Sequence, residues 1–221
     1  MRELEFGRRA AASGPGRSLV ILLHGYGADG NDLLGLAGPL GAHLPHTVFV
    51  APNAPSACSG NPFGYEWFPI PWLDGSSEAE SHAAMIAAAE DLDGFIDAQM
   101  AAENVDAGQT VLLGFSQGTM MSLHVAPRRK KVVAGVVGFS GRLLAPELLA
   151  AQTISRPPVL LIHGDQDDMV PIASLAEAAD GLTAVGFSVF THVSKGTAHG
   201  IAPDGLGVAL PFMRDRLAAP G

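Results

Sequence analysis

A serine held between two glycines, Ser116 in the stretch Gly114-Phe-Ser-Gln-Gly118, constrains the fold more than any other feature of this sequence. The apolar run before it has the length of a buried strand, and the apolar run after it reads as a helix that Pro127 ends. A serine in so tight a turn needs neighbours without a Cβ, because a Cβ at either glycine would collide with the adjacent backbone. Its hydroxyl is then exposed beside a helix N-terminus, where backbone N–H groups favour negative charge. The pattern predicts a nucleophilic serine on a strand–turn–helix elbow.

The alternative is a plain Gly-Ser turn between a buried strand and a buried helix. The chain holds 27 glycines among 221 residues, so a chance match to this short pattern is not rare. The rest of the sequence must therefore decide between the two interpretations.

Length, composition and charge narrow the class of protein. The 221 residues suit one domain, residues 1–221, and 48% hydrophobic against 16% charged residues is typical of a soluble globular chain. A net charge of −9 argues against nucleic acid or an anionic membrane as a partner. The one cysteine, Cys58, allows no internal disulfide, and the apolar run Leu19–Leu23 is too short for a signal core or a membrane span. We expect a cytoplasmic protein without stable membrane association, whose oligomeric state stays open.

Strand-like and helix-like stretches alternate along the chain. The continuous apolar run at 18–23 is typical of a strand buried on both faces of a parallel sheet. Ser77 and Glu80 have the spacing of a capping box and predict the start of a long helix. The alternation predicts an α/β fold with a mostly parallel central sheet and helices on both faces. Further strands are predicted at 47–50, 110–114, 132–139, 158–163 and 187–193, with an edge strand within 1–9, and the buried face of the long helix is predicted to include Met85, Ala88, Leu92, Phe95 and Ile96.

Two connections carry further expectations. Only a short helix fits between the strands at 132–139 and 158–163, which leaves no room for a cap or lid domain. The one basic run, Arg128–Lys131, is expected to form a solvated loop.

Gly25, Gly27 and Gly30 form a G-x-G-x-x-G pattern after a strand, which is the fingerprint of a dinucleotide-binding fold. That fold also needs an acidic residue about twenty positions further on, at the end of the second strand, to bind the ribose hydroxyls. No Asp or Glu occurs between Asp32 and Glu66. We therefore expect no dinucleotide and no other cofactor. A loop in this place is suited instead to aim a backbone N–H at a developing oxyanion.

A serine hydroxyl becomes an effective nucleophile when a base takes its proton, and a third group must orient that base. In α/β-hydrolases the chain order is Ser, then Asp or Glu, then His. His199 follows the last predicted strand in a Gly/Thr/Ala loop and can reach Ser116, whereas His192 lies within that strand. His24 and His163 precede glycines at strand ends and are expected to serve packing or loop hydrogen bonding. No metal site is expected, because the other histidines show no ligand spacing: His43, His46, His82 and His124. The acids that follow the strand at 158–163 and could orient the base are Asp165, Asp167 and Asp168.

Taken together, these motifs resemble those of the phospholipase/carboxylesterase family of small serine hydrolases, to which the acyl-protein thioesterases belong. The resemblance implies a minimal α/β-hydrolase fold without a cap domain and the hydrolysis of carboxylic esters. The matching segments span nearly the whole chain in the family's order: LLHGYGADGNDLLGLA (22–37), APNAP (51–55), GYEWFPI (64–70), GFSQG (114–118), GFSG (138–141), HGDQDDMVP (163–171) and AHGI (198–201).

The resemblance also implies roles for single residues. Ser116 is expected to be the nucleophile and His199 the base. Asp167 is expected to be the triad carboxylate, with Asp168 as a rival and Asp165 bracing the turn.

By the same resemblance, the backbone N–H groups of Tyr26 and Gln117 are expected to form the oxyanion hole. Many relatives have glycine directly before the catalytic histidine, where this chain has Ala198. This departure leaves the shape of the histidine loop open.

Aromatic side chains gather in one long loop, residues 60–73, which is expected to emerge at the active end of the sheet. An acyl or aryl pocket is predicted there. The alternative is that the aromatic residues only fix a long loop to its own domain. The residues predicted to bind substrate are Phe63, Trp67, Phe68 and Leu73.

The sequence thus predicts a serine carboxylesterase that acts on a small-molecule ester, aryl esters and thioesters included. Lysophospholipase or acyl-protein thioesterase activity is the first alternative. The second is a catalytically silent binding protein of the same fold, which the complete set of Ser116, Asp167 and His199 disfavours.

Overall fold

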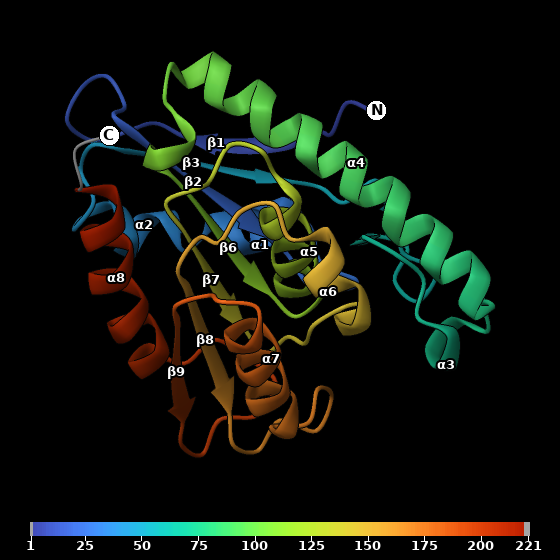
Figure 1. Cartoon of the computed structure of the whole chain (residues 1–221). Coiled ribbons are helices and arrows are strands. Elements are labelled where there is room, and N and C mark those ends of the chain that lie inside the picture. Colours follow the sequence, from blue (N-terminus) through green and yellow to red (C-terminus); the bar gives the residue numbers. More distant parts are fainter. Residues whose placement is uncertain (1, 219–221) are drawn as a thin grey trace.

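The computed structural model describes residues 2–218; the predicted domain range of 1–221 also includes Met1 and residues 219–221, which lie outside the described residues. Within 2–218, seven strands form one sheet in the order β1-β3-β2-β6-β7-β8-β9 (Figure 1). β1 runs antiparallel to β3 at one edge, and all other neighbouring pairs are parallel. The predicted α/β fold with a mostly parallel sheet is confirmed. The strands are β1 (Phe6–Arg9), β2 (Ser18–Leu23), β3 (Thr47–Pro52), β6 (Thr110–Phe115), β7 (Gly135–Phe139), β8 (Val159–Gly164) and β9 (Val189–Ser194).

Helices cover both faces of this sheet (Figure 1). One buried cluster joins the sheet to α4, α5, α6 and α7, and a second joins it to α1, α2 and α8. Ile21 belongs to the first cluster and its neighbour Leu22 to the second, so β2 is apolar without alternation because both of its faces are covered. The helices are α1 (Gly30–Leu34), α2 (Ala37–Gly41), α3 (Pro71–Asp74), α4 (Glu78–Glu103), α5 (Gln117–Val125), α6 (Pro146–Gln152), α7 (Ala173–Ala184) and α8 (Pro203–Leu217), with short 3₁₀ turns at Ala107–Gln109 and Ala126–Arg128.

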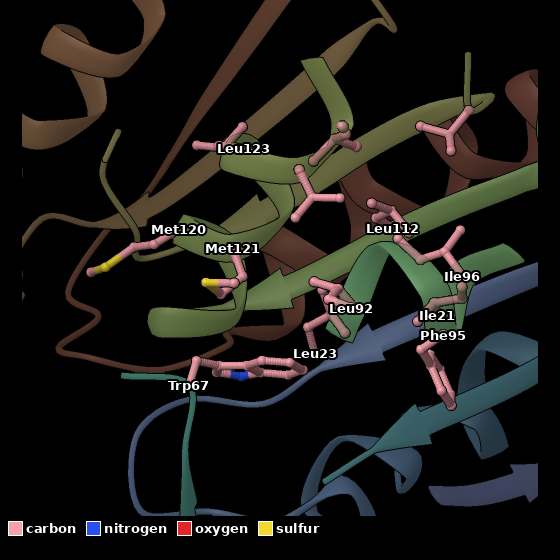
Figure 2. Packing of buried hydrophobic residues seen from close by; sticks show 14 of the residues in the cluster. Ile21, Leu23, Trp67, Leu92, Phe95, Ile96, Leu112, Met120, Met121 and Leu123 are labelled. Atoms are coloured by element: carbon pink, nitrogen blue, oxygen red, sulfur yellow. The ribbon is translucent and has the colours of Figure 1, made fainter. Parts of the chain in front are cut away.

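The long helix α4 begins where its capping box predicts. The Ser77 side chain accepts the Glu80 N–H, and the Glu80 carboxylate accepts the Ser77 N–H. Leu92, Phe95 and Ile96 of α4 point toward the sheet, where Figure 2 shows them near side chains of β2 and β6. All five residues predicted for the inner face of this helix are buried.

The connections between neighbouring strands of the chain are short, except for the one that follows β3. Only α6 lies between β7 and β8, and residues 2–218 contain no inserted cap domain. The long connection between β3 and α4 carries a small hairpin, β4 (Ser56–Ala57) with β5 (Tyr65–Glu66), followed by α3. Among the described residues, no helix is both long and apolar enough to cross a membrane.

One expectation about the surface is wrong. Arg129, from the basic run expected to be a solvated loop, is 4% exposed. Its guanidinium pairs with Asp93 and Asp97 on α4. A buried arginine needs such partners, because an unpaired buried charge is costly. This part of the run therefore fastens α4 to the end of α5.

The first turn of α5 packs against β2 so closely that only glycine fits. A Cβ on Gly118 would lie 1.8 Å from the carbonyl oxygen of Leu23. On the outer face of α8, a Cβ on Gly207 would meet nothing within 4 Å. These two glycines provide a matched test of the elbow packing.

We expect Gly118→Ala to lower the free energy of unfolding by more than about 3 kcal/mol, because backbone atoms cannot move aside as a flexible side chain can. Gly207→Ala should raise it by roughly 0.5–1 kcal/mol, because alanine loses less backbone entropy in a helix. Urea unfolding followed by circular dichroism measures both values. A Gly118→Ala protein as stable as wild type would contradict the packing described here.

Candidate active site

Three loops meet at the carboxyl-terminal edge of the sheet. Ser116 directly follows β6, Asp167 lies in the loop after β8, and His199 lies in the loop after β9. Because the three strands are parallel, their carboxyl ends share one edge. This arrangement brings together Ser116 and His199, which are 83 positions apart in the sequence.

The backbone of Ser116 is strained, with φ 54° and ψ −117°. A positive φ in a residue other than glycine costs free energy and persists only where the surroundings impose it. Here the Ser116 N–H donates to the carbonyl of Phe139 on β7 at 2.9 Å. A Cβ on Gly114 would lie 2.4 Å from the Gly118 carbonyl, so both glycines of the motif are required by close backbone contacts, as predicted.

Ser116, His199 and Asp167 form a continuous chain of hydrogen bonds. The Nε2 atom of His199 lies 3.0 Å from Ser116 Oγ. The Nδ1 atom of the same ring lies 2.8 Å and 3.0 Å from the two carboxylate oxygens of Asp167. A carboxylate only accepts, so Nδ1 carries the proton and the lone pair of Nε2 faces the serine hydroxyl. This is the tautomer in which His199 can take a proton from Ser116.

The Asp167 side chain is buried, and the loop that carries it closes around one of its oxygens. The N–H groups of Met169 and Val170 both donate to Oδ1, at 3.0 Å and 2.9 Å. Burial acts to raise the pKa of this carboxyl, but the hydrogen bonds from Val170 and His199 outweigh it and leave the pKa of Asp167 below its usual value. Its carboxyl group therefore stays ionised, and remains a hydrogen-bond acceptor, at a lower pH than that of an ordinary aspartate.

The two neighbouring acids lie elsewhere. Asp168 is exposed, and no hydrogen bond joins it to His199 within residues 2–218. Asp165 accepts the N–H of Gly196 at 2.7 Å and lies 3.4 Å from the Lys195 ammonium. Asp165 therefore joins the loop after β8, which carries Asp167, to the loop after β9, which carries His199.

The two N–H groups predicted for the oxyanion hole flank the serine. A Cβ on Gly25 would lie 3.3 Å from the Cβ of Ser116, so the loop after β2 passes close to this serine. Tyr26, the next residue in this loop, and Gln117 both line the same pocket as Ser116. Neither backbone N–H donates to another protein group among the residues that the structure describes.

A buried histidine shapes the loop after β2. The Ala54 N–H donates to His24 Nε2 at 2.9 Å, so the His24 Nδ1–H donates to the Gly25 carbonyl at 2.7 Å. Burial lowers the pKa of His24, which keeps the ring neutral and able to accept the Ala54 N–H. The Trp67 indole N–H donates to the His24 carbonyl at 3.0 Å. His24 is thus a structural support next to Tyr26, in line with the loop role expected from the sequence.

The Gln117 side chain fastens the aromatic loop to the elbow. Its Oε1 accepts the Trp67 N–H at 3.1 Å, and its Nε2 donates to the Phe68 carbonyl at 2.7 Å. The residue directly after Ser116 therefore fixes the loop that contributes Phe68 to the pocket wall.

A pocket of about 410 Å³ opens at Ser116 and His199. Of the four residues predicted to bind substrate, Phe68 and Leu73 lie in its lining. Phe63 is 89% exposed and lies outside the lining. Trp67 is 1% exposed and points into the core, where Figure 2 shows it beneath Met121. Trp67 therefore fits the second interpretation given for this loop, in which an aromatic side chain fastens the loop to the core of the domain.

Much of the pocket wall comes from residues other than the four predicted to bind substrate. The apolar part draws on α3 and α4, on the start of α5, and on the loops after β7 and β8. Apart from residues 70–72, which belong to the aromatic loop, this part of the wall comes from separate segments between residues 85 and 171, so no single local pattern marks it. These residues are Ile70, Pro71, Trp72, Met85, Met120, Leu144, Met169, Val170 and Pro171, and the charged residues of the lining are Asp32, Glu78 and Arg142.

Within residues 2–218, no group of three or more His, Cys, Asp or Glu side chains is arranged to hold a metal ion. Asp167 and His199 are engaged with each other, and Asp167 also accepts two backbone N–H groups.

Comparisons with known proteins extend this description. A model of the phospholipase/carboxylesterase family matches residues 10–216. The esterase YpfH of Escherichia coli is 28% identical over 201 residues, covering 90% of this chain and 83% of YpfH. Acyl-protein thioesterase 1 of Schizosaccharomyces pombe is 27% identical over 208 residues, covering 91% and 92% of the two chains.

Solved structures give the same picture. The crystal structure of esterase PE8 is 44% identical, with a TM-score of 0.92, over 98% of this chain and all of PE8. Acyl-protein thioesterase 2 of Zea mays, at 22% identity, a TM-score of 0.78 and coverage of 98% and 100%, shares the fold. The resemblance read from the motifs is confirmed: the chain belongs to the phospholipase/carboxylesterase family.

Proposed function

We propose that the protein is a serine carboxylesterase that hydrolyses small to medium carboxylic esters through an acyl-serine intermediate. The observation that carries this proposal is the 3.0 Å contact between His199 Nε2 and Ser116 Oγ, made while Asp167 holds Nδ1 of the same ring. The likeness to esterase PE8, at 44% identity over 98% of the chain, supports the same activity.

The mechanism follows from this geometry. Ser116 Oγ attacks the ester carbonyl while His199 Nε2 takes its proton. Asp167 fixes the ring and offsets the positive charge that develops on it. His199 then gives the proton to the leaving alcohol, and the acyl group stays on Ser116. Water, activated by the same histidine, hydrolyses the acyl-serine and restores the enzyme.

The negative charge on the carbonyl oxygen needs donors that are already in place. The free N–H groups of Tyr26 and Gln117 are the donors we assign to it. One such donor typically lowers the barrier by about 3 kcal/mol.

The substrate is a small-molecule ester that enters an uncapped pocket. Thioesters form the same acyl-serine, and the likeness to a protein named acyl-protein thioesterase 1 favours them as the second candidate. The family's description also names phospholipases, so lysophospholipid esters are the third candidate. A catalytically silent binding protein is disfavoured, because such a protein would not need a complete Ser116–His199–Asp167 chain.

We also propose that the enzyme acts in the cytoplasm, without nucleic acid or a stable membrane as partner. Its net charge of −9 and its single cysteine, Cys58, which is buried and free, support this setting.

Hydrolysis of p-nitrophenyl acetate, butyrate and octanoate tests the proposal. We expect wild-type turnover of these esters and its loss in Ser116→Ala. Ser122→Ala is the matched control, since the Ser122 hydroxyl only bonds back to the Gly118 carbonyl on the same helix. Turnover by Ser116→Ala at the wild-type rate, or none by folded wild type, would refute the esterase.

The size of the pocket predicts the trend with chain length. Its apolar wall reaches from Phe68 to Met169, so butyrate should exceed acetate in kcat/KM. Each buried methylene contributes about 0.8 kcal/mol, or roughly a fourfold gain. A preference for acetate would place the acyl chain outside this pocket.

Paired aspartate variants test the assignment of the triad carboxylate. Asp167→Asn should lower kcat by about 10⁴-fold, because an amide favours the wrong imidazole tautomer. Asp168→Asn should stay within about twofold of wild type, because that side chain is exposed and makes no hydrogen bond to the His199 ring among the described residues. The opposite order of the two effects, measured by steady-state kinetics, would assign the carboxylate to Asp168.

A further inference from the structure

A second imidazole lies on the triad carboxylate. His163, the penultimate residue of β8, is 2% exposed, and its Nε2 lies 3.3 Å from Oδ2 of Asp167. The same nitrogen lies 2.8 Å from the carbonyl oxygen of Val170. A carbonyl oxygen only accepts, so Nε2 of His163 must carry its proton. This N–H therefore faces two acceptors in the loop after β8, the Asp167 carboxylate and the Val170 carbonyl.

Val170 links this histidine to the geometry of Asp167. Its N–H donates to Asp167 Oδ1 at 2.9 Å, while its carbonyl accepts from His163. With both polar groups of one residue held, the turn from Asp167 to Val170 has little freedom to rotate away. A turn that loses the His163 contact is left with an unpaired buried carbonyl, which is unfavourable unless the backbone shifts.

The two histidines contact the carboxylate in different ways. His199 reaches it from the loop after β9, with side-chain exposure of 19%, and also contacts Ser116. His163 is enclosed, makes no hydrogen bond to Ser116 among the described residues, and is not itself part of the pocket lining. It therefore has no direct contact with a reacting atom, and any effect it has on turnover passes through Asp167.

We propose that His163 is a positioning residue, whose Nε2–H holds the Asp167–Val170 turn so that the carboxylate keeps His199 aligned with Ser116. This inference rests on the proposed esterase function. It predicts that the N–H donor at this position matters more than the ring volume.

Two substitutions separate the donor from the volume. His163→Gln places an amide N–H near the position of Nε2, whereas His163→Met fills similar space without a donor. We expect His163→Met to lower kcat by about 10- to 100-fold, the usual effect of losing a hydrogen bond to a charged or buried group, and His163→Gln to restore most of it. A packing role would give the reverse order, with Met closer to wild type, and that order would overturn the proposal.

Two NMR signals test the same inference without turnover. In wild type, long-range ¹H–¹⁵N spectra should show His163 as the Nε2–H tautomer; the Nδ1–H tautomer would overturn the proposal even if His163→Met failed to fold. The downfield resonance of the His199 Nδ1 proton, shared with Asp167, should be retained in His163→Gln and move upfield or broaden in His163→Met. An unchanged resonance in folded His163→Met would also count against it.

The assay and the spectra fail separately. Wild type and Ser116→Ala run beside the His163 variants. Absence of wild-type turnover refutes the esterase, while the tautomer and the His199 resonance still decide whether His163 positions the carboxylate.

Discussion

The close contact between the first turn of α5 and the end of β2 is the constraint on which the site depends. Gly118 lies against the Leu23 carbonyl with no space for a Cβ, two residues after Ser116, whose φ is 54°. Next to this contact, the loop after β2 passes beside Ser116. Gly25 and Tyr26 belong to this loop. Ser116 and the candidate oxyanion donors therefore lie next to the same packing contact between α5 and β2.

The base and the carboxylate depend on a second connection, between the loops after β8 and β9. The Gln166 N–H donates to the Thr197 carbonyl, and Asp165 accepts the N–H of Gly196. These bonds join the turn that carries Asp167 to the turn that carries His199. The two loops form one unit at the sheet edge, and the departure from the family at Ala198 leaves the contact of His199 with Ser116 in place. The backbone hydrogen bonds between these two loops hold Asp167 and His199 in place opposite the strained turn at Ser116.

Features that depend on neighbouring residues in the chain could be predicted from the sequence. The capping box at Ser77 fixes the start of α4, the apolar run at 18–23 marks a doubly covered strand, and the two glycines around Ser116 mark the elbow. The contacts among the triad side chains follow from strand order and from parallel pairing.

The pocket wall could not be read in the same way. The direction of each aromatic side chain in residues 60–73 depends on contacts with distant elements. Trp67 points inward because its indole N–H meets the His24 carbonyl and its ring fills the core, while Phe63 projects from a hairpin. Arg129 was misjudged for the same reason, since its partners Asp93 and Asp97 belong to another helix. Pairings of this kind leave no periodic signal in the sequence.

The central claim is that Ser116 is a nucleophile activated by His199. Its most direct test is labelling with paraoxon, followed by mass spectrometry of the intact chain and its peptides. The account predicts one diethylphosphoryl group per chain, on the peptide that contains Ser116, and none in a folded His199→Ala protein. A label on another residue, or no label on folded wild type, would contradict it.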